Sequence, residues 1–100
     1  MIVLKTNREL ALMREACIIS AGALKLAGEA VEPGVTTAEI DKIAYDYIIK
    51  CGAKPNFLNY NGYPATACIS INDEVIHGIP SKKRVIEEGD IVSIDLGAVL

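Results

Sequence analysis

The chain has 100 residues, of which 51% are hydrophobic, and its formal net charge is −3. That length fits one small domain or a piece of a larger one, and the high apolar fraction predicts surface that further chain or a partner must cover. The acidic balance argues against nucleic-acid binding, the three cysteines argue against a disulfide framework and for a cytoplasmic protein, and no apolar run is long enough to span a membrane.

A long helix is predicted near the start of the chain. Thr6 and Glu9 have the spacing of a capping box, in which each residue satisfies a backbone N–H of the other. Apolar residues then recur at helical spacing on two stripes. We therefore expect a helix over residues 7–31 that is covered on more than one face.

A second helix is predicted after the turn at Glu32–Gly34. Thr36 and Glu39 repeat the capping-box spacing, and apolar residues from Ile40 to Cys51 recur at i, i+3 and i+4. Gly52 is well placed to cap its C-terminal end. The opposite face carries charged side chains and should be solvated: Asp41, Lys42, Asp46 and Lys50.

The character of the sequence changes after Gly52. Residues 54–64 are rich in Pro, Asn and Gly, which predicts a loop, and they hold three of the five aromatic residues, Phe57, Tyr60 and Tyr63. Clustered aromatics on a loop either line an apolar pocket or fasten the loop to the core. Composition does not decide between these two interpretations.

The second half of the chain predicts antiparallel strands. Residues 66–71 and 74–77 read as a hairpin closed by Asn72–Asp73, and residues 91–98 read as a further strand. In that last strand Asp95 shares a face with the small residues Ser93 and Gly97, because successive side chains alternate between faces. The open space in front of this carboxylate suits a ligand or a metal, although a hydrogen-bonded strand carboxylate is the alternative.

The single histidine, His77, lies in the stretch from Cys68 to Pro80, which is the part of the chain best suited to chemistry. An imidazole can donate, accept or bind a metal near neutral pH, but a loop-anchoring histidine has the same sequence signature. Cys68 lies in an apolar strand, which favours a packed thiol over a nucleophile. One histidine and one carboxylate do not make a metal site, because a divalent ion needs several ligands.

Three blocks of sequence, Asn61–Pro64, Cys68–Pro80 and Glu88–Asp95, occur in an order and spacing that resemble the type I methionine aminopeptidase family. The resemblance extends over essentially the whole chain. It implies the "pita-bread" α/β fold, in which two similar halves flank a pair of divalent metal ions. Residues 1–100 would be the N-terminal half of a single catalytic domain, with two long helices followed by an antiparallel β-sheet.

The resemblance also implies roles for individual residues. Asp95 matches the first metal ligand, and His77 matches the catalytic histidine that hydrogen-bonds the substrate near the scissile amide. Four side chains match positions that line the methionine pocket: Phe57, Tyr60, Tyr63 and Cys68. The backbone around Asn72 resembles part of a monovalent-cation site.

The implied activity is removal of the initiator methionine from nascent proteins when the next residue is small. The full-length enzyme would be a cytoplasmic monomer with two divalent ions (cobalt, manganese, iron or zinc), with the ribosome as a candidate partner and with no nucleic-acid or membrane partner. The other metal ligands of the family lie beyond Leu100, so the 100-residue chain is expected to be inactive alone. Two alternatives stay open: a non-catalytic peptide-binding module of the same fold, and a proline-cleaving dipeptidase relative.

Overall fold

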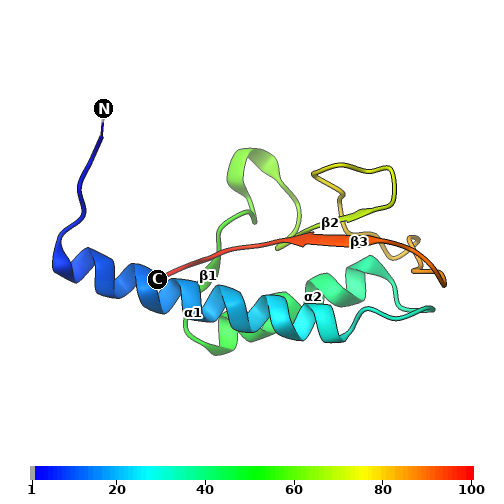
Figure 1. Cartoon of the computed structure of the whole chain (residues 1–100), viewed down its shortest axis with the longest axis horizontal. Coiled ribbons are helices and arrows are strands. Elements are labelled where there is room, and N and C mark those ends of the chain that lie inside the picture. The colour runs from blue at the N-terminus through cyan, green and yellow to red at the C-terminus, as the bar shows by residue number, and fades with distance from the viewer. Residues whose placement is uncertain (1) are drawn as a thin grey trace.

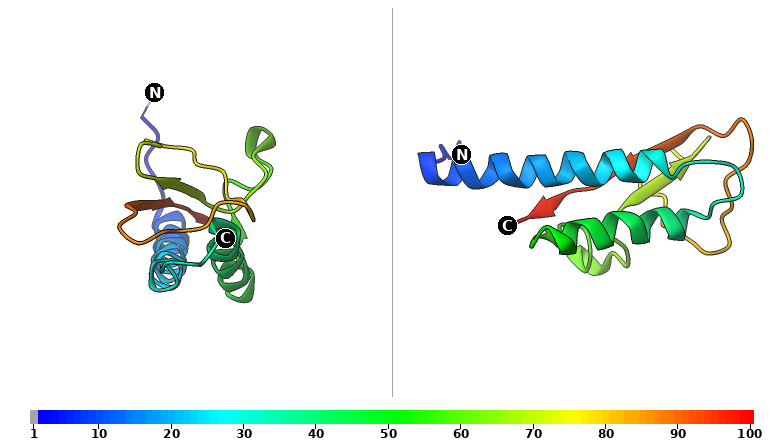
Figure 2. Two further views of the ribbon diagram at one scale, coloured as in Figure 1. Left: turned by 90° about the vertical axis from the view of Figure 1, so that its right-hand side faces the viewer. Right: turned by 90° about the horizontal axis from the view of Figure 1, so that it is seen from below.

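The computed structural model describes residues 2–100 and arranges them in two layers (Figures 1 and 2). One layer holds two long helices that run antiparallel, side by side, α1 (Asn7–Glu29) and α2 (Thr37–Lys50). The other holds the short strands β1 (Lys54–Pro55), β2 (Cys68–Ile71), β3 (Val92–Asp95) and β4 (Ala98–Val99), together with a 3₁₀ turn, η1 (Tyr60–Gly62). The predicted α/β class, two helices followed by antiparallel strands, is confirmed.

The capping box predicted at the start of α1 is present. The Glu9 backbone N–H donates to Thr6 Oγ1 at 3.2 Å, and the Thr6 N–H donates to Glu9 Oε1 at 2.9 Å. The helix ends at Glu29, two residues before the predicted end, with Ala30 as its C-cap.

Helix α2 ends as local sequence rules predict, whereas only one of the two bonds of the predicted capping box is present at its start. Thr36 Oγ1 accepts from the Glu39 N–H at 3.2 Å. At the other end Gly52 has φ +80°, and its N–H donates to Ile49 O while the Ala53 N–H donates to Ile48 O. This pair of bonds is a Schellman motif, and it needs the left-handed backbone that glycine adopts without strain.

The strands form two antiparallel pairs. β2 pairs with β3, with Cys68 opposite Asp95, and β1 pairs with β4, with Pro55 opposite Ala98. Three sequence predictions need correction here. Residues 74–77 do not form a strand, the strand expected over residues 91–98 is interrupted between Asp95 and Ala98, and the loop expected over residues 54–64 contains β1.

The backbone conformation explains why residues 74–77 do not form a strand. Asn72 (φ +55°) and His77 (φ +61°) both have left-handed conformations, which extended pairing does not allow. The Glu74 side chain folds back to accept from the Ile71 N–H at 3.0 Å. β2 is therefore partnered by β3, which arrives about twenty residues later, and not by the segment that directly follows it.

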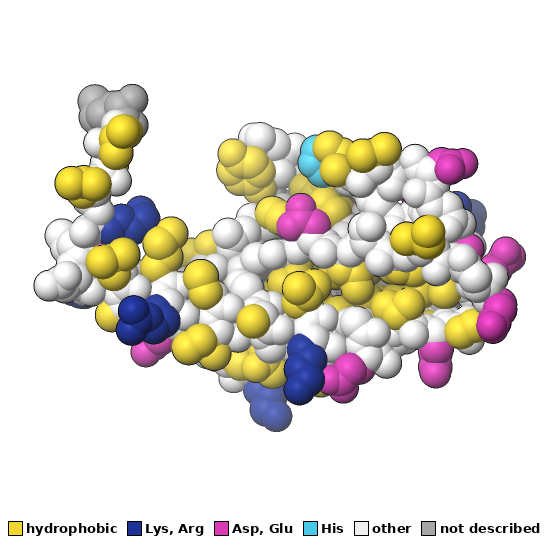
Figure 3. Space-filling view, viewed as in Figure 1, with side chains coloured by type: hydrophobic (Ala, Val, Ile, Leu, Met, Phe, Trp, Pro, Cys, Tyr) yellow, Lys and Arg dark blue, Asp and Glu magenta, His cyan; other side chains and the backbone are white. Residues whose placement is uncertain are grey.

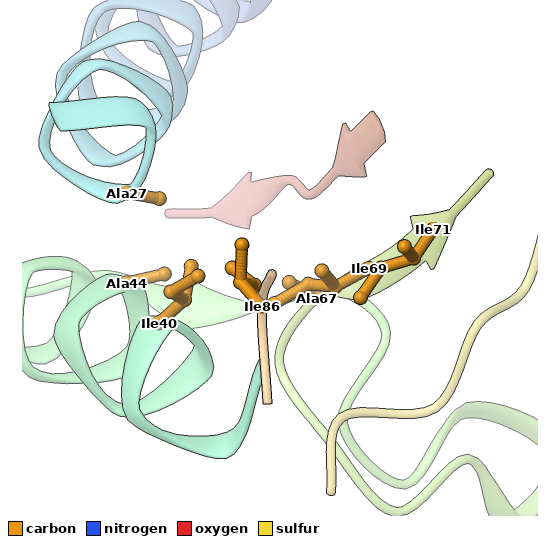
Figure 4. Packing of buried hydrophobic residues seen from close by; sticks show 7 residues of the cluster. All are labelled: Ala27, Ile40, Ala44, Ala67, Ile69, Ile71 and Ile86. Atoms are coloured by element: carbon orange, nitrogen blue, oxygen red, sulfur yellow. The ribbon is translucent and has the colours of Figure 1, made fainter. Parts of the chain in front are cut away.

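The main core lies between the helix layer and the inner face of β2. Figure 4 shows Ile40 of α2, Ile86 and Ala67 pointing toward one another, with Ile69 and Ile71 continuing the row along β2; all five side chains are buried. The alternation predicted for the last strand is present, because Val92, Ile94 and Leu96 pack against this cluster.

Apolar surface remains exposed, as the composition predicts. Helix α1 buries only Ala23 and Ala27, whereas several of its large apolar side chains are about half exposed: Leu10, Leu12, Met13 and Leu24. Figure 3 shows further hydrophobic side chains uncovered between the helix layer and the strands. The expectation that α1 is covered on more than one face is not met by contacts among residues 2–100. Neither helix in this range is long and apolar enough to cross a membrane.

Candidate active site

The site residues predicted from the sequence gather around one pocket. It has a volume of about 590 Å³ and opens between the loop around η1 and the paired strands β2 and β3. All six predicted residues line it: Phe57, Tyr60, Tyr63, Cys68, His77 and Asp95. Four further lining residues were not predicted as site residues: Asn61, Gly62, Pro64 and Ile79.

The aromatic wall is shaped by a tightly turned loop. Asn59 and Asn61 have φ values of +68° and +49°, a left-handed conformation that asparagine tolerates better than most residues. The Asn59 N–H donates to Tyr63 O at 2.8 Å and closes the loop on itself. The rings of Phe57 and Tyr63 meet edge to face, with centroids 6.4 Å apart. The structure shows both uses considered for these aromatics, because all three line the pocket and the Tyr63 hydroxyl fastens the loop to Ala67.

Tyr63 joins two sides of the pocket. Its hydroxyl donates to Ala67 O at 2.8 Å and lies 3.4 Å from Gly78 O, across the pocket wall. Burial raises the pKa of the Tyr63 phenol far above its usual value, and the neighbouring Cys68 thiol raises the pKa further. The hydroxyl therefore stays protonated and keeps its role as a donor. Tyr60, by contrast, is 67% exposed at the rim.

His77 is presented to the pocket by the glycine that follows it. A Cβ on Gly78 would lie 2.1 Å from Ile69 O, so only glycine allows this close approach to β2. Gly78 accepts from the Ile69 N–H at 2.8 Å and donates to Ser70 Oγ at 3.0 Å. The neighbour that Gly78 approaches is thus the backbone of β2.

His77, which lines the pocket, has a strained left-handed backbone conformation with φ +61°. A left-handed conformation at a residue other than glycine is uncommon and persists where the surroundings hold it. Here the two hydrogen bonds of Gly78 hold it, and the adjacent Val75 and Ile76 are left 85% and 68% exposed. The imidazole is exposed and lies at the pocket, so it is not a core histidine.

Asp95 stands on β3 directly opposite Cys68, with its side chain on the face away from the core. Together with His77 it supplies one carboxylate and one imidazole to the pocket. Within residues 2–100 no three His, Cys, Asp or Glu side chains come together to hold a metal ion. The donors present are too few for a divalent ion, which takes four or more ligands.

Asp41 was predicted to face solvent, and that prediction is wrong. Its Oδ1 accepts from the Ala67 N–H at 2.7 Å, at the start of β2, and the side chain is half-buried. Burial raises its pKa, while hydrogen bonds from the backbone of Ala67 and Thr66 act in the opposite direction. The available signal was position: Asp41 lies one turn from both Thr37 and Ala44, which are buried on α2.

The pocket holds an aromatic wall, an imidazole and a carboxylate, and comparison with known families identifies the class of protein. The chain belongs to metallopeptidase family M24, whose family model matches residues 11–100. Dependence on a divalent metal is a property of that family. The predicted family is thereby confirmed.

Individual members of the family show which proteins the chain is similar to in sequence and structure. The chain is 52% identical over 100 residues to methionine aminopeptidase of Clostridium acetobutylicum, covering all of this chain and 40% of that protein. The crystal structure of methionine aminopeptidase from Thermotoga maritima matches with a TM-score of 0.97 at 40% identity, covering 99% of this chain and 40% of that one. The Xaa-Pro dipeptidase from Bacillus anthracis matches with a TM-score of 0.78 at 28% identity, covering 95% and 25%. The chain therefore spans about 40% of the length of the curated relatives it matches, and the predicted N-terminal part of the pita-bread fold is confirmed.

Proposed function

We propose that this chain is the N-terminal part of an aminopeptidase that removes an initiator methionine when the following residue is small. The observation that carries the proposal is the convergence of Phe57, Tyr60, Tyr63, Cys68, His77 and Asp95 on one pocket. The identity to proteins named methionine aminopeptidase, continuous over the whole chain, supports it. In this proposal residues 1–100 are part of one catalytic domain and not a domain of their own.

The pocket wall suits a methionine side chain. Two edge-to-face aromatic rings and the Cys68 thiol, which is only 6% exposed, form an apolar surface. Sulfur–aromatic contacts contribute roughly 0.3–1.5 kcal/mol each, so such a wall favours a thioether over an alkyl chain of the same length. Phe57, Tyr60, Tyr63 and Cys68 bind the side chain in this scheme.

His77 and Asp95 act at the other end of the bound residue. The exposed imidazole of His77 donates a hydrogen bond to the substrate near the scissile amide. A proton donor at that position can stabilise the transition state. Asp95 would bind one of two divalent ions, with cobalt, manganese, iron and zinc as candidates, because carboxylates accept all four. The remaining ligands come from outside residues 2–100. The proposal further includes a monovalent cation bound near Asn72. It places the enzyme in the cytoplasm as a monomer that acts on nascent chains and contacts the ribosome.

The test uses a hybrid protein in which this chain replaces the matching first 40% of the Clostridium acetobutylicum enzyme. The hybrid is supplied with each divalent metal in turn and offered Met-Ala-Ser, Met-Leu-Ser and the proline dipeptide Ala-Pro. We expect methionine release from the first peptide only, and none from the isolated chain. Cleavage of the proline peptide in preference would favour the dipeptidase relative. Binding of the methionine peptide without cleavage, in a metal-loaded hybrid, would favour the non-catalytic module.

A further inference from the structure

A carboxylate outside the pocket is bonded directly to the strand that forms it. Asp41 lies on α2, in the helix layer, and its Oδ1 accepts the Ala67 N–H at 2.7 Å. Thr66 and Ala67 are fully buried and lead directly into Cys68, the first residue of β2 and part of the pocket wall.

The backbone of Ala67 also connects Asp41 to the two sides of the pocket. The carbonyl oxygen of Ala67 accepts a hydrogen bond from the Tyr63 hydroxyl at 2.8 Å. The residue whose N–H bonds to Asp41 therefore also holds the aromatic loop. That hydroxyl also reaches Gly78 O at 3.4 Å, next to His77. A single connected set of hydrogen bonds therefore runs from α2 through the start of β2 to Tyr63 and to the backbone beside His77.

The carboxylate at position 41 is not explained by an ion pair. Within residues 2–100 the ion pairs are Lys42–Asp46 and Arg84–Glu74, and neither includes Asp41. Burying half of an acidic side chain without a cation opposes folding, and the raised pKa of Asp41 expresses that opposition. What the side chain gains in return is the hydrogen bond from the Ala67 backbone N–H, which directly precedes β2. Its contacts are thus directed at the pocket wall and not at the stability of α2.

We propose that Asp41 is a positioning residue of the pocket, which fixes the start of β2 so that Tyr63 and the His77 backbone hold their places on either side of it. The inference rests on the proposed function only where it treats the pocket as a substrate site. The position of the pocket wall can be measured without substrate or metal. A failure of the aminopeptidase activity therefore leaves the positioning role separately testable.

The measurement is the rate at which iodoacetamide alkylates Cys68 in the full chain. Cys17 and Cys51, which are exposed, are replaced by serine in every variant so that only the buried Cys68 can react. Asp41→Asn keeps an Oδ1 acceptor for Ala67, whereas Asp41→Leu removes it. Asp46→Leu is the matched control, because Asp46 is an exposed carboxylate on the same helix.

We expect Cys68 alkylation in Asp41→Leu to be at least tenfold faster than in the parent, and that in Asp41→Asn and Asp46→Leu to stay within twofold. The faster rate should not change with low concentrations of urea, since opening of one strand end exposes little surface. In ¹H–¹⁵N spectra the Ala67, Tyr63 and Gly78 amide signals should move in Asp41→Leu and not in Asp46→Leu. Asp41→Ser, whose side chain is too short to reach Ala67, serves if the leucine variant does not fold.

Two results would overturn the proposal. The first is an alkylation rate in Asp41→Leu or Asp41→Ser that matches the Asp46→Leu control. The second is a faster rate that rises with urea as steeply as global unfolding does, because Asp41 would then contribute to overall stability alone and not to the placement of the pocket wall.

Discussion

Gly78→Ala tests the close approach that presents His77 to the pocket. The added Cβ would lie 2.1 Å from Ile69 O and 2.8 Å from Ser70 Cα, so backbone must move by about an ångström to reach ordinary contact. That movement breaks the Ile69 N–H bond to Gly78 O and the Gly78 N–H bond to Ser70 Oγ. Each buried group left without a partner costs roughly 1–3 kcal/mol, so we expect a loss of about 2–4 kcal/mol in the free energy of unfolding.

Urea unfolding of the two proteins measures this loss, because a change in the midpoint at constant slope is a change in stability. Gly28→Ala is the matched control. A Cβ at Gly28 in α1 meets nothing within 4 Å, and alanine in a helix is favoured over glycine by roughly 0.5–1 kcal/mol. We expect the control to be as stable as the parent or more so. A Gly78→Ala protein within 0.5 kcal/mol of the parent would refute the reasoning.

Four further predictions concern individual contacts. In Gly22→Ala the new Cβ would lie 2.3 Å from the Tyr47 hydroxyl oxygen, so the variant should lose stability by urea unfolding, and Tyr47→Phe in the same chain should restore part of it. Equal losses in the single and double variants would contradict that contact. Thr36→Ala removes the N-cap of α2 and should cost about 0.5–2 kcal/mol, which thermal unfolding detects; no change would contradict the cap. Burial raises the folded-state pKa of Asp41 above 3.8, so the stability of the parent relative to Asp41→Asn should fall as the pH rises above 3.8. The Glu87 backbone N–H lowers the pKa of Asp90 below 3.8, so the stability of the parent relative to Asp90→Asn should rise with pH between the lowered pKa and 3.8, and should be lost as the pH falls through the lowered pKa. A difference that rises with pH for Asp41, or falls with pH for Asp90, would refute the corresponding assignment.

The helices could be predicted because their signals are local. Thr6 with Glu9, and Thr36 with Glu39, bond within one turn of their own helix. Gly52 likewise ends α2, because its N–H bonds to Ile49 O and the N–H of the next residue, Ala53, bonds to Ile48 O. Such contacts need no knowledge of the rest of the fold.

The strand pairing could not be predicted in the same way. Alternation in residues 91–98 indicated which side chains face the core, and the structure agrees. The partner of β2 was mistaken because the turn at Asn72 does not lead into a hairpin. Its side chain instead bonds to the Ile91 N–H and to Asp90, which tie this turn to the start of β3. That connection spans nearly twenty residues and has no local signature.

The pocket was predictable from the resemblance of three sequence blocks, whereas the side chain behind it was not. Tyr63, His77 and Asp95 lie on the three segments whose order is distinctive, and they do line one pocket. Asp41 looks like any charged residue on an exposed helix face. Its hydrogen bond joins residues 26 apart in the sequence, and only the packing of α2 against the start of β2 reveals it.

The most direct test of the central claim is methionine release from Met-Ala-Ser by the hybrid protein, compared with the same hybrid carrying Asp95→Asn or His77→Ala. Both side chains line the pocket, and neither is buried in the core, so either change should leave folding intact. We predict release by the parent hybrid and a loss of at least a hundredfold in kcat/KM for each variant, equivalent to about 2.7 kcal/mol of transition-state stabilisation. Turnover by either variant at the rate of the parent would contradict the assignment of this pocket as the active site.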